Sequence, residues 1–220
     1  IAGLSFPDKG KIILENENIS RKKIQKRQIG LVFQDLAVFP HLSVFDNIAF
    51  ALRKKRMSRY ELRRKVIELA NNMDITHLLR RKPGTLSGGE LQRIALARTL
   101  ALKPKCLLLD EPLASVDVQL KSDIRNLLRT INRQGNTIVH VTHDYEEAVA
   151  LASTVAVIHR GKIVQTGTPE EIFTAPKSPF VAKFIGEDNF FRAKLMPDNG
   201  NGVKTAFLNQ KLKINLSACY

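Results

Sequence analysis

The amino-acid sequence predicts an α/β fold with a largely parallel sheet, and three observations lead to this prediction. Short apolar runs of strand length recur at 106–109, 137–142 and 155–159. Longer segments with apolar residues at helical spacing lie between these runs, and strands that alternate with helices are typical of α/β proteins. We expect the strands at 106–109 and 137–142 to be buried on both faces, as the strands of parallel sheets are.

The length and composition are those of a soluble globular protein. The chain has 220 residues, enough for roughly one and a half domains, with 44% apolar and 25% charged residues. No apolar run approaches the roughly 20 residues that cross a bilayer, and no signal peptide opens the chain. Cys106 and Cys219 cannot form the disulfide framework of a secreted protein. These observations favour a reducing, cytosolic compartment.

The formal net charge is +14, from 35 basic and 21 acidic residues. Such an excess suits nucleic acid or an anionic membrane surface as a partner. Much of it lies at 21–27, 53–65 and 80–82, in segments that we expect to be loops and exposed helix faces. Because no aromatic residues interleave with these charges to stack on bases, we expect no nucleic-acid partner.

The first elements follow from apolar spacing and capping signals. Residues 11–14 and 28–34 are predicted strands. Ser58, with Glu61 three residues later, forms a capping box, and the apolar residues that follow recur at helical spacing as far as about Asn72.

The central elements alternate in type. A helix is predicted at 91–102, immediately behind the sequence Leu-Ser-Gly-Gly-Glu, and the strand at 106–109 follows it. A long helix at 118–134 leads into the strand at 137–142, and a short helix at 145–152 comes next.

The pattern of predicted elements changes in the last part of the chain. After a strand at 155–159 and a second at 163–165, the capping box that starts at Thr168 begins a short helix. Two prolines then mark a linker. Three consecutive strands are predicted at 191–195, 203–208 and 212–216, too few to close a domain, so we expect an incomplete β-domain there.

Two adjacent carboxylates follow the strand at 106–109. Open α/β sheets bind ligands at the carboxyl ends of their strands, where Asp110 and Glu111 are expected. In phosphate chemistry the first carboxylate can hold Mg²⁺ and the second can deprotonate an attacking water. The alternative is a pair of loop acids that cap the next helix.

The segment Ser87-Gly88-Gly89 has the features of an anion site. Its glycines allow close backbone approach, Ser87 supplies a hydroxyl, and the N-terminus of a helix lies directly behind. The alternative is that Ser87 and Glu90 form only a capping box, a local role that does not exclude the first.

Two further polar residues follow predicted strands. His143 comes after the strand at 137–142 and could hydrogen-bond a γ-phosphate or a catalytic water. Gln34 ends another strand and can ligate Mg²⁺ or hold water through its amide oxygen. Taken singly, a histidine of this kind is more often a satisfied loop residue.

The order of these features resembles that of ATP-binding cassette (ABC) proteins over about residues 1–186. The segments that are similar to the family's Q-loop, signature, Walker B, D-loop and switch histidine are Val32-Phe33-Gln34, Leu86-Ser87-Gly88-Gly89-Glu90, Leu107-Leu108-Leu109-Asp110-Glu111-Pro112, Ala114-Ser115-Val116-Asp117 and Val141-Thr142-His143-Asp144. The resemblance implies a P-loop NTPase core with a helical signature region at about 44–86, followed from residue 187 by the start of a small, barrel-like regulatory β-domain.

The resemblance also implies roles for individual residues, with ATP and Mg²⁺ as the bound groups. Asp110 and Gln34 would hold Mg²⁺, and Gln34 would also sense the permease. Glu111 would be the general base, and His143 would contact the γ-phosphate and the water. In a head-to-tail homodimer, the segment Ser87-Gly88-Gly89 would bind the γ-phosphate of the second copy, and Asp117 would link the two sites.

Three further segments are similar to the importer branch of the family, whose members carry molybdate, tungstate, sulfate, polyamine, iron(III) or sugar. They are Phe39-Pro40-His41-Leu42-Ser43-Val44, His143-Asp144-Tyr145-Glu146-Glu147-Ala148 and Gly167-Thr168-Pro169-Glu170-Glu171-Ile172. This similarity implies a peripheral subunit at the cytoplasmic face of the inner membrane. Its partners would be a membrane permease, docked on the loop 35–50, and indirectly a solute-binding protein.

The sequence departs from the family pattern at three places. Glu90 stands where glutamine is commoner, and the segment that ends in Asp117 differs in its other residues. No G-x-x-x-x-G-K-[ST] sequence, the Walker A loop that cradles nucleotide phosphates, occurs in the 220 residues. Residues 1–4 are similar to the end of the helix behind that loop, so we expect an N-terminal truncation and no activity from this chain alone.

Two other functions remain open at this stage. A DNA-repair or chromosome-maintenance ATPase shares the signature and Walker B sequences, but 52 residues between Gln34 and Ser87 leave no room for the long coiled coil that such proteins insert. A truncated cassette without catalytic activity is the second.

Overall fold

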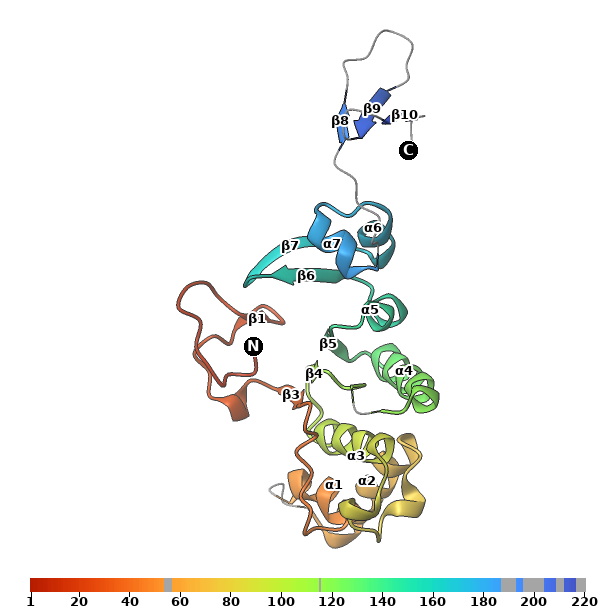
Figure 1. Ribbon diagram of the computed structural model, residues 1–220. Helices are drawn as coiled ribbons and strands as arrows, with labels where there is room; N and C mark the ends of the chain where they lie inside the picture. Colours follow the sequence, from red (N-terminus) through yellow and green to blue (C-terminus); the bar gives the residue numbers. More distant parts are fainter. Residues whose placement is uncertain (54–56, 115, 187–192, 196–203, 209–211, 217–220) are drawn as a thin grey trace. The chain divides into compact units, whose positions relative to one another are not determined.

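The computed structural model describes residues 1–53, 57–114, 116–186, 193–195, 204–208 and 212–216. The chain divides into two compact units, Ile1–Ala152 and Ser153–Tyr220. Figure 1 shows the order of their helices and strands. The domain boundary expected between residues 186 and 187 stays a prediction.

A parallel sheet of three strands lies at the centre of the first unit. Strands β3 (Ile29–Val32), β4 (Cys106–Asp110) and β5 (Thr137–Val141) lie in this order, and both neighbouring pairs are parallel. Val32 is the register partner of Leu109, and Asp110 is the partner of Val141. The predicted α/β fold is confirmed, and the carboxyl ends of the three strands meet at one edge.

Burial differs between the two strands that were expected to be covered on both faces. The first four residues of β4 are buried, as predicted, but the residues of β5 alternate between exposed and half-buried. Val139 and Val141 are 39% and 55% exposed. The expectation for β5 was wrong because only the face that carries Ile138 packs against the hydrophobic core.

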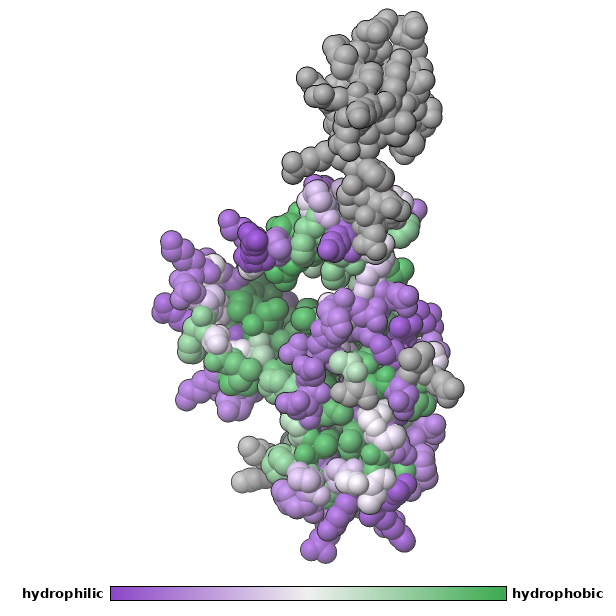
Figure 2. Space-filling model, in the orientation of Figure 1, coloured by the Kyte–Doolittle hydropathy of each residue, from purple (hydrophilic) through white to green (hydrophobic). Residues whose placement is uncertain are grey.

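Three helices lie in and directly after the region 44–86 that was predicted to be helical, and the third begins beyond the predicted end of that region. They are α1 (Val44–Leu52), α2 (Arg59–Asn72) and α3 (Gly88–Leu100), and α1 packs against both others. Short 3-10 turns at Thr76–Leu78 and Pro83–Thr85 connect α2 to α3. Figure 2 shows hydrophilic side chains at the outer end of this region, as expected for its many basic residues.

The segment 35–50, which was predicted to be a loop, is a loop only in its first part. Its second part belongs to α1, where the Ser43 side chain accepts a hydrogen bond from the Asp46 backbone and caps the helix. Val44, Ile48 and Leu52 bury one face of α1. The helical spacing of these residues explains the difference.

The first unit is completed by two helices and a short hairpin. Helix α4 (Val118–Arg133) follows β4, α5 (Tyr145–Leu151) follows β5, and strands β1 (Ile13–Leu14) and β2 (Glu17–Asn18) pair antiparallel. A 3-10 turn covers Ile24–Lys26. Residues 1–4 form neither a helix nor a strand.

The second unit begins with an antiparallel hairpin of β6 (Val155–His159) and β7 (Lys162–Gly167). Two short helices follow, α6 (Pro169–Thr174) and α7 (Pro179–Phe184). Strands β8 (Ala193–Leu195), β9 (Lys204–Leu208) and β10 (Leu212–Leu216) then form an antiparallel sheet in the order β10-β9-β8. These strands fall within the three predicted ones, and the ends predicted at 191, 192 and 203 lie outside the described residues.

Among the residues described, no helix combines the length and apolar character that crossing a membrane requires.

Candidate functional site

The carboxyl edge of the parallel sheet collects the predicted catalytic side chains. Asp110 is the last residue of β4 and Glu111 follows it, while Gln34 and His143 each lie two residues beyond the ends of β3 and β5. Because the strands are parallel and in register, all four residues lie at the same edge. Their residue types suit phosphate chemistry at that position.

Glu111 and His143 form the closest contact of this group. The Nδ1 atom of His143 lies 2.7 Å from the Oε1 atom of Glu111, and the backbone N–H of His143 donates to the same oxygen at 3.2 Å. The backbone N–H of Glu111 donates to the Val141 carbonyl at 3.0 Å, and its φ of 48° lies in the left-handed region. Two elements that are 32 residues apart in sequence are thus joined through one carboxylate.

The two side chains of this pair differ in how far they are exposed to solvent. The His143 side chain is 80% exposed, whereas that of Glu111 is 20% exposed. The hydrogen bond to Glu111, followed by the charge of this carboxylate, raises the pKa of His143 above its ordinary value. The imidazole therefore faces solvent, while the carboxylate beside it is mostly shielded.

The buried carboxylate of Glu147, to which the sequence assigned no individual role, holds the loop around His143. The Glu147 side chain is 3% exposed and accepts a hydrogen bond from the Thr142 hydroxyl at 3.0 Å. Its Oε1 atom lies 3.5 Å from the Nζ atom of Lys121 on α4, and the Asp144 backbone N–H donates to the Thr142 hydroxyl. The spacing of Asp144 and Glu147, an N-cap and its N3 residue, is the sequence signal that could have pointed to this cluster.

His140 faces the same carboxylate from β5. Its Nε2 atom lies 3.4 Å from Oε2 of Glu147, an ion-pair distance without the alignment of a hydrogen bond. Burial lowers the pKa of His140, and the nearby carboxylates only partly oppose this effect. The pKa shifts of His140 and His143 therefore have opposite directions, because burial dominates at His140 and the hydrogen bond to Glu111 dominates at His143.

Asp110 and Gln34 fit a Mg²⁺ ion that is shared with a nucleotide. Both side chains belong to exposed residues at the sheet edge. Within the described part of the chain, no group of three or more His, Cys, Asp or Glu side chains could hold a metal ion alone. Mg²⁺ in nucleotide sites takes one or two protein oxygens and completes its shell with phosphates and water, so the donor set of one carboxylate and one amide suits it.

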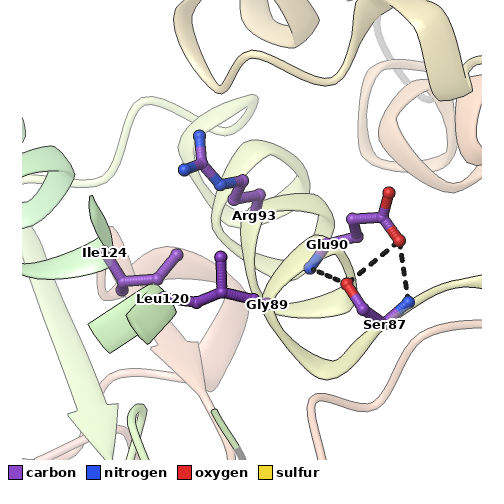
Figure 3. A pocket seen from close by; sticks show the side chains of 6 residues that line it. All are labelled: Ser87, Gly89, Glu90, Arg93, Leu120 and Ile124. Atoms are coloured by element: carbon purple, nitrogen blue, oxygen red, sulfur yellow. Dashed lines mark hydrogen bonds between the residues drawn. The ribbon is translucent and has the colours of Figure 1, made fainter. Parts of the chain in front are cut away.

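The N-terminus of α3 has the capping box that the sequence predicted. The Ser87 hydroxyl lies 3.0 Å from Oε2 of Glu90, the Ser87 backbone N–H donates to that oxygen at 2.7 Å, and the Glu90 backbone N–H donates to the hydroxyl at 3.3 Å (Figure 3). The hydrogen bond from the Ser87 backbone holds the pKa of Glu90 below its usual range. The capping box is therefore present, with a charged carboxylate beside the hydroxyl.

Gly89 allows α3 and α4 to approach closely. A Cβ atom at this position would lie 3.2 Å from the Cδ1 atom of Leu120 on α4. An open cavity of about 320 Å³ lies here, and Figure 3 shows the residues that line it, which are Ser87, Gly89, Glu90, Arg93, Leu120 and Ile124. Gly88 and Gly89 form the first two residues of α3, where backbone N–H groups have no partner within the helix.

Asp117 stands at the N-cap of α4, but its side chain makes no capping hydrogen bond. An N-cap aspartate normally uses its carboxylate in this way. The residue is exposed, so its carboxylate is presented to solvent. No described hydrogen bond or ion pair connects Asp117 or Ser87 to Glu111 or His143, so the predicted residues form two groups, one at the sheet edge and one at the helix N-termini.

Gln92 is a further polar residue of α3 whose burial the sequence did not predict. The residue is completely buried, and neither its amide nitrogen nor its amide oxygen has a hydrogen-bond partner among the residues described. Leaving such atoms unpaired costs on the order of 1–3 kcal/mol each. A polar residue in an apolar helix face gives no local sequence signal for this environment.

Comparisons with known proteins show to which proteins the chain is similar. A family model described as ABC transporter matches residues 1–114. The chain is 48% identical over 190 residues to the molybdate/tungstate import ATP-binding protein WtpC of Pyrococcus horikoshii, which covers 86% of this chain and 55% of the relative. It is 46% identical to the sulfate/thiosulfate import ATP-binding protein CysA 2 of Rhizobium meliloti, over 86% of this chain and 53% of the relative.

A third relative and a solved structure extend the comparison. The spermidine/putrescine import ATP-binding protein PotA of Haemophilus influenzae is 43% identical, over 89% of this chain and 53% of the relative. The chain thus spans about half the length of these three relatives. A dimeric, post-hydrolysis structure of the ATP-binding cassette MJ0796 with ADP and Pi has a TM-score of 0.68 and 29% identity, covering 77% of both chains.

Proposed function

The chain belongs to the ABC transporter family, and we propose that it is the ATP-binding and hydrolysing part of an importer, which drives a solute through a membrane permease. The observation that carries this proposal is the contact of Glu111 with His143, directly beside Asp110 at the carboxyl edge of the sheet. Three relatives named as import ATP-binding proteins support it.

In the proposed reaction, Glu111 accepts a proton from the water that attacks the γ-phosphorus of ATP. A bond forms between the water oxygen and phosphorus, the bond to the β-phosphate oxygen breaks, and ADP and inorganic phosphate leave. His143, which Glu111 orients through Nδ1, presents its exposed ring to the γ-phosphate and the water. Asp110 and Gln34 would hold Mg²⁺, which neutralises phosphate charge when it is bound.

We propose that the active form is a head-to-tail homodimer. The two groups of site residues are not connected to each other in one chain, which suits sites assembled from two copies. Ser87, Gly88 and Gly89 of one copy would contact the γ-phosphate bound by the other, since a hydroxyl and free helix N–H groups bind anions. The carboxylate of Asp117, which makes no capping hydrogen bond to α4, would link the two sites.

The phosphate-binding loop is the part of the site that these residues do not supply. The 220 residues contain no G-x-x-x-x-G-K-[ST] sequence, and phosphoryl transfer depends on the charge neutralisation that such a loop provides. We therefore propose that the 220 residues alone have no measurable ATPase activity. We use the term complete subunit for a chain in which these residues follow a phosphate-binding loop segment of about 40 residues.

The proposed partners are a membrane permease, a second copy of the subunit and, indirectly, a solute-binding protein. The proposed location is peripheral, at the cytoplasmic face of the inner membrane. Relatives named for oxyanions, molybdate/tungstate and sulfate/thiosulfate, share 48% and 46% identity with the chain, and a relative named for polyamines, spermidine/putrescine, shares 43%. We infer that other subunits select the solute, and that this chain supplies the ATPase.

The test is Mg²⁺-dependent ATP turnover by the complete subunit, together with its size in solution with and without ATP. We expect turnover that requires Mg²⁺, and a dimer that ATP stabilises and ADP does not. A complete subunit that stays monomeric with ATP and releases no phosphate would contradict the proposed function.

A further inference from the structure

The first part of the predicted docking segment, 35–43, is held by polar side chains from two different helices. Asn47 on α1 is completely buried, and its amide nitrogen donates to the carbonyls of Phe39 and Ser43 at 3.1 and 3.0 Å. Its amide oxygen accepts the Phe39 backbone N–H at 2.8 Å. The side of the loop that faces α1 is therefore fixed by a local contact.

Arg98 on α3 holds the same loop from farther along the chain. Its Nη1 atom donates to the Ala37 carbonyl at 2.7 Å, across 61 residues of sequence. Its guanidinium carbon lies 5.0 Å from the centre of the Phe39 ring, a cation–π distance, and this ring packs against Phe50 with the two centres 4.5 Å apart. One side chain thus contacts both the backbone and an aromatic ring of the loop.

The loop has a backbone conformation that needs such support. Leu36 and Ala37 have φ angles of 57° and 45°, in the left-handed region that residues other than glycine rarely adopt. Consecutive residues of this kind persist only where surrounding contacts hold them in place. The hydrogen bond from Arg98 ends on the second of these two residues.

The position of Arg98 on α3 connects this loop to the predicted nucleotide contact. Ser87 caps the first turn of α3, and Arg98 lies eleven residues later, close to the last residue of the helix, Leu100. Eleven residues of α-helix span about 16 Å. A single rigid helix therefore has the predicted phosphate contact at its N-terminal end and, near its C-terminal end, the hydrogen bond from Arg98 to the loop.

We propose that Arg98 is a positioning residue that couples ATP binding at Ser87 to the conformation of loop 35–43, which faces the permease. This inference rests on the proposed function. When the ATP of the second copy pulls on the N-terminus of α3, the helix moves as a unit, and Arg98 carries the carbonyl of Ala37 and the ring of Phe39 with it. The exposed ring of Phe50, which packs against Phe39 with the two ring planes tilted by 50°, belongs to the surface that then shifts.

The test is hydrogen exchange of the backbone amides of residues 36–39, with and without ATP, in a complete subunit that carries Glu111→Gln to retain ATP. The first variant is Arg98→Met, which keeps an apolar side chain but has no charge and no hydrogen-bond donor. The second is Arg98→Lys, which keeps the positive charge but lacks the planar guanidinium group. Arg129→Met is the matched control, because Arg129 also donates to a backbone carbonyl, that of Ala150 at 2.8 Å, but from α4.

We expect ATP to slow exchange at 36–39 in the parent and in Arg129→Met. In Arg98→Met the ATP-dependent difference should be lost while the ATP dimer still forms, and Arg98→Lys should restore part of it. With the permease present and Glu111 intact, Arg98→Met should lower solute transported per ATP by about fivefold or more, a coupling of ordinary size.

Each other outcome has a definite meaning. An unchanged ATP response in Arg98→Met overturns the proposal, as does loss of the ATP dimer in that variant alone, which would place Arg98 in the nucleotide site. Failure of both Arg98 variants to fold would assign the residue a structural role only, and would equally overturn it. If the parent itself forms no ATP dimer, the proposed function has failed, and the role of Arg98 fails with it.

Discussion

The Oε1 atom of Glu111 contacts His143 twice. It accepts a hydrogen bond from the His143 backbone N–H at 3.2 Å, and it lies 2.7 Å from Nδ1 of the His143 ring. The candidate general base is therefore already oriented by the residue that we expect to contact the γ-phosphate. This arrangement ties the loop after β5 to the end of β4, and it makes the two side chains dependent on each other.

Replacing Glu111 by glutamine should keep ATP binding and remove most of the turnover. The amide preserves the shape of the side chain and an acceptor for His143, but it cannot take a proton from water. We expect the steady-state rate of the complete subunit to fall by about 10²–10⁴-fold, with an ATP-bound dimer accumulating in size-exclusion chromatography. Unchanged hydrolysis would remove Glu111 from the role of base.

The same substitution should lower the pKa of His143. The hydrogen bond to Glu111 is the main cause of its raised pKa, so the value in Glu111→Gln should move down toward that of a free histidine, as read from the ring protons by NMR. Glu146→Gln is the control, since it removes a nearby negative charge that does not contact His143. Equal shifts in the two variants would contradict a specific pair.

The raised pKa also fixes how this contact depends on pH. A histidine whose pKa is raised by folding stabilises the native state below its unfolded pKa, and this contribution is lost as the pH rises through the higher folded value. The Glu111–His143 contact should therefore loosen on the alkaline side of the ordinary histidine range. Amide exchange of residues 142–144, followed from pH 6 to pH 9, measures this effect.

Two serines in equivalent capping boxes separate a structural from a functional role. Ser58 caps α2 through Glu61 with the same three hydrogen bonds that Ser87 makes with Glu90. Ser87→Ala should cost about 1 kcal/mol of stability, and Ser58→Ala a comparable amount, in thermal or urea unfolding. Only Ser87→Ala should also weaken the ATP dimer, and a loss of the same size in both variants would leave Ser87 as a cap alone.

A charge at Phe39 should prevent assembly with the permease. Phe39 is half-buried beside Arg98 and Phe50, in the part of the segment that remains a loop. We expect Phe39→Asp to abolish co-purification with the permease and to spare ATP hydrolysis by the complete subunit. Tyr60→Asp, at a position that is 76% exposed on α2, is the control. If Phe39→Asp unfolds the protein instead, Phe39 belongs to the core and the docking assignment is wrong.

The 220 residues alone should be inactive, although they contain Asp110, Glu111 and His143. Without a phosphate-binding loop, most of the charge on the β- and γ-phosphates stays unneutralised. We expect no measurable turnover and weak nucleotide affinity from this chain, and Mg²⁺-dependent turnover once the loop segment is added. Robust hydrolysis by the short chain that Glu111→Gln abolishes would show that the phosphate site comes from residues within it.

Local patterns predicted the parts of the fold that local physics decides. The run from Cys106 to Leu109 is apolar and buried, as expected for a strand that is covered on both faces, and the capping boxes at Ser58, Ser87 and Thr168 mark where α2, α3 and α6 begin. The same reasoning failed for β5, since its exposure depends on what packs against it rather than on its own residues.

In the candidate site, too, the sequence predicted the features that depend on local pattern and missed those that depend on tertiary packing. Its edge residues were found because each follows a strand or precedes a helix, positions that sequence alone reveals. Lys121 and Glu147, or Arg98 and Ala37, meet only when the chain folds, and their separations of 26 and 61 residues carry no periodic signal. Contacts of this kind can be read from the three-dimensional structure only.

The exposed valines of β5 have a practical consequence for work with the short chain. Val139 and Val141 lie on an outer strand of the three-stranded sheet, whose unpaired backbone groups can template pairing with another molecule. We therefore expect the short chain to aggregate as its concentration rises. Purification at low concentration, or co-expression with a segment that covers β5, is therefore the appropriate way to obtain it as a monodisperse sample.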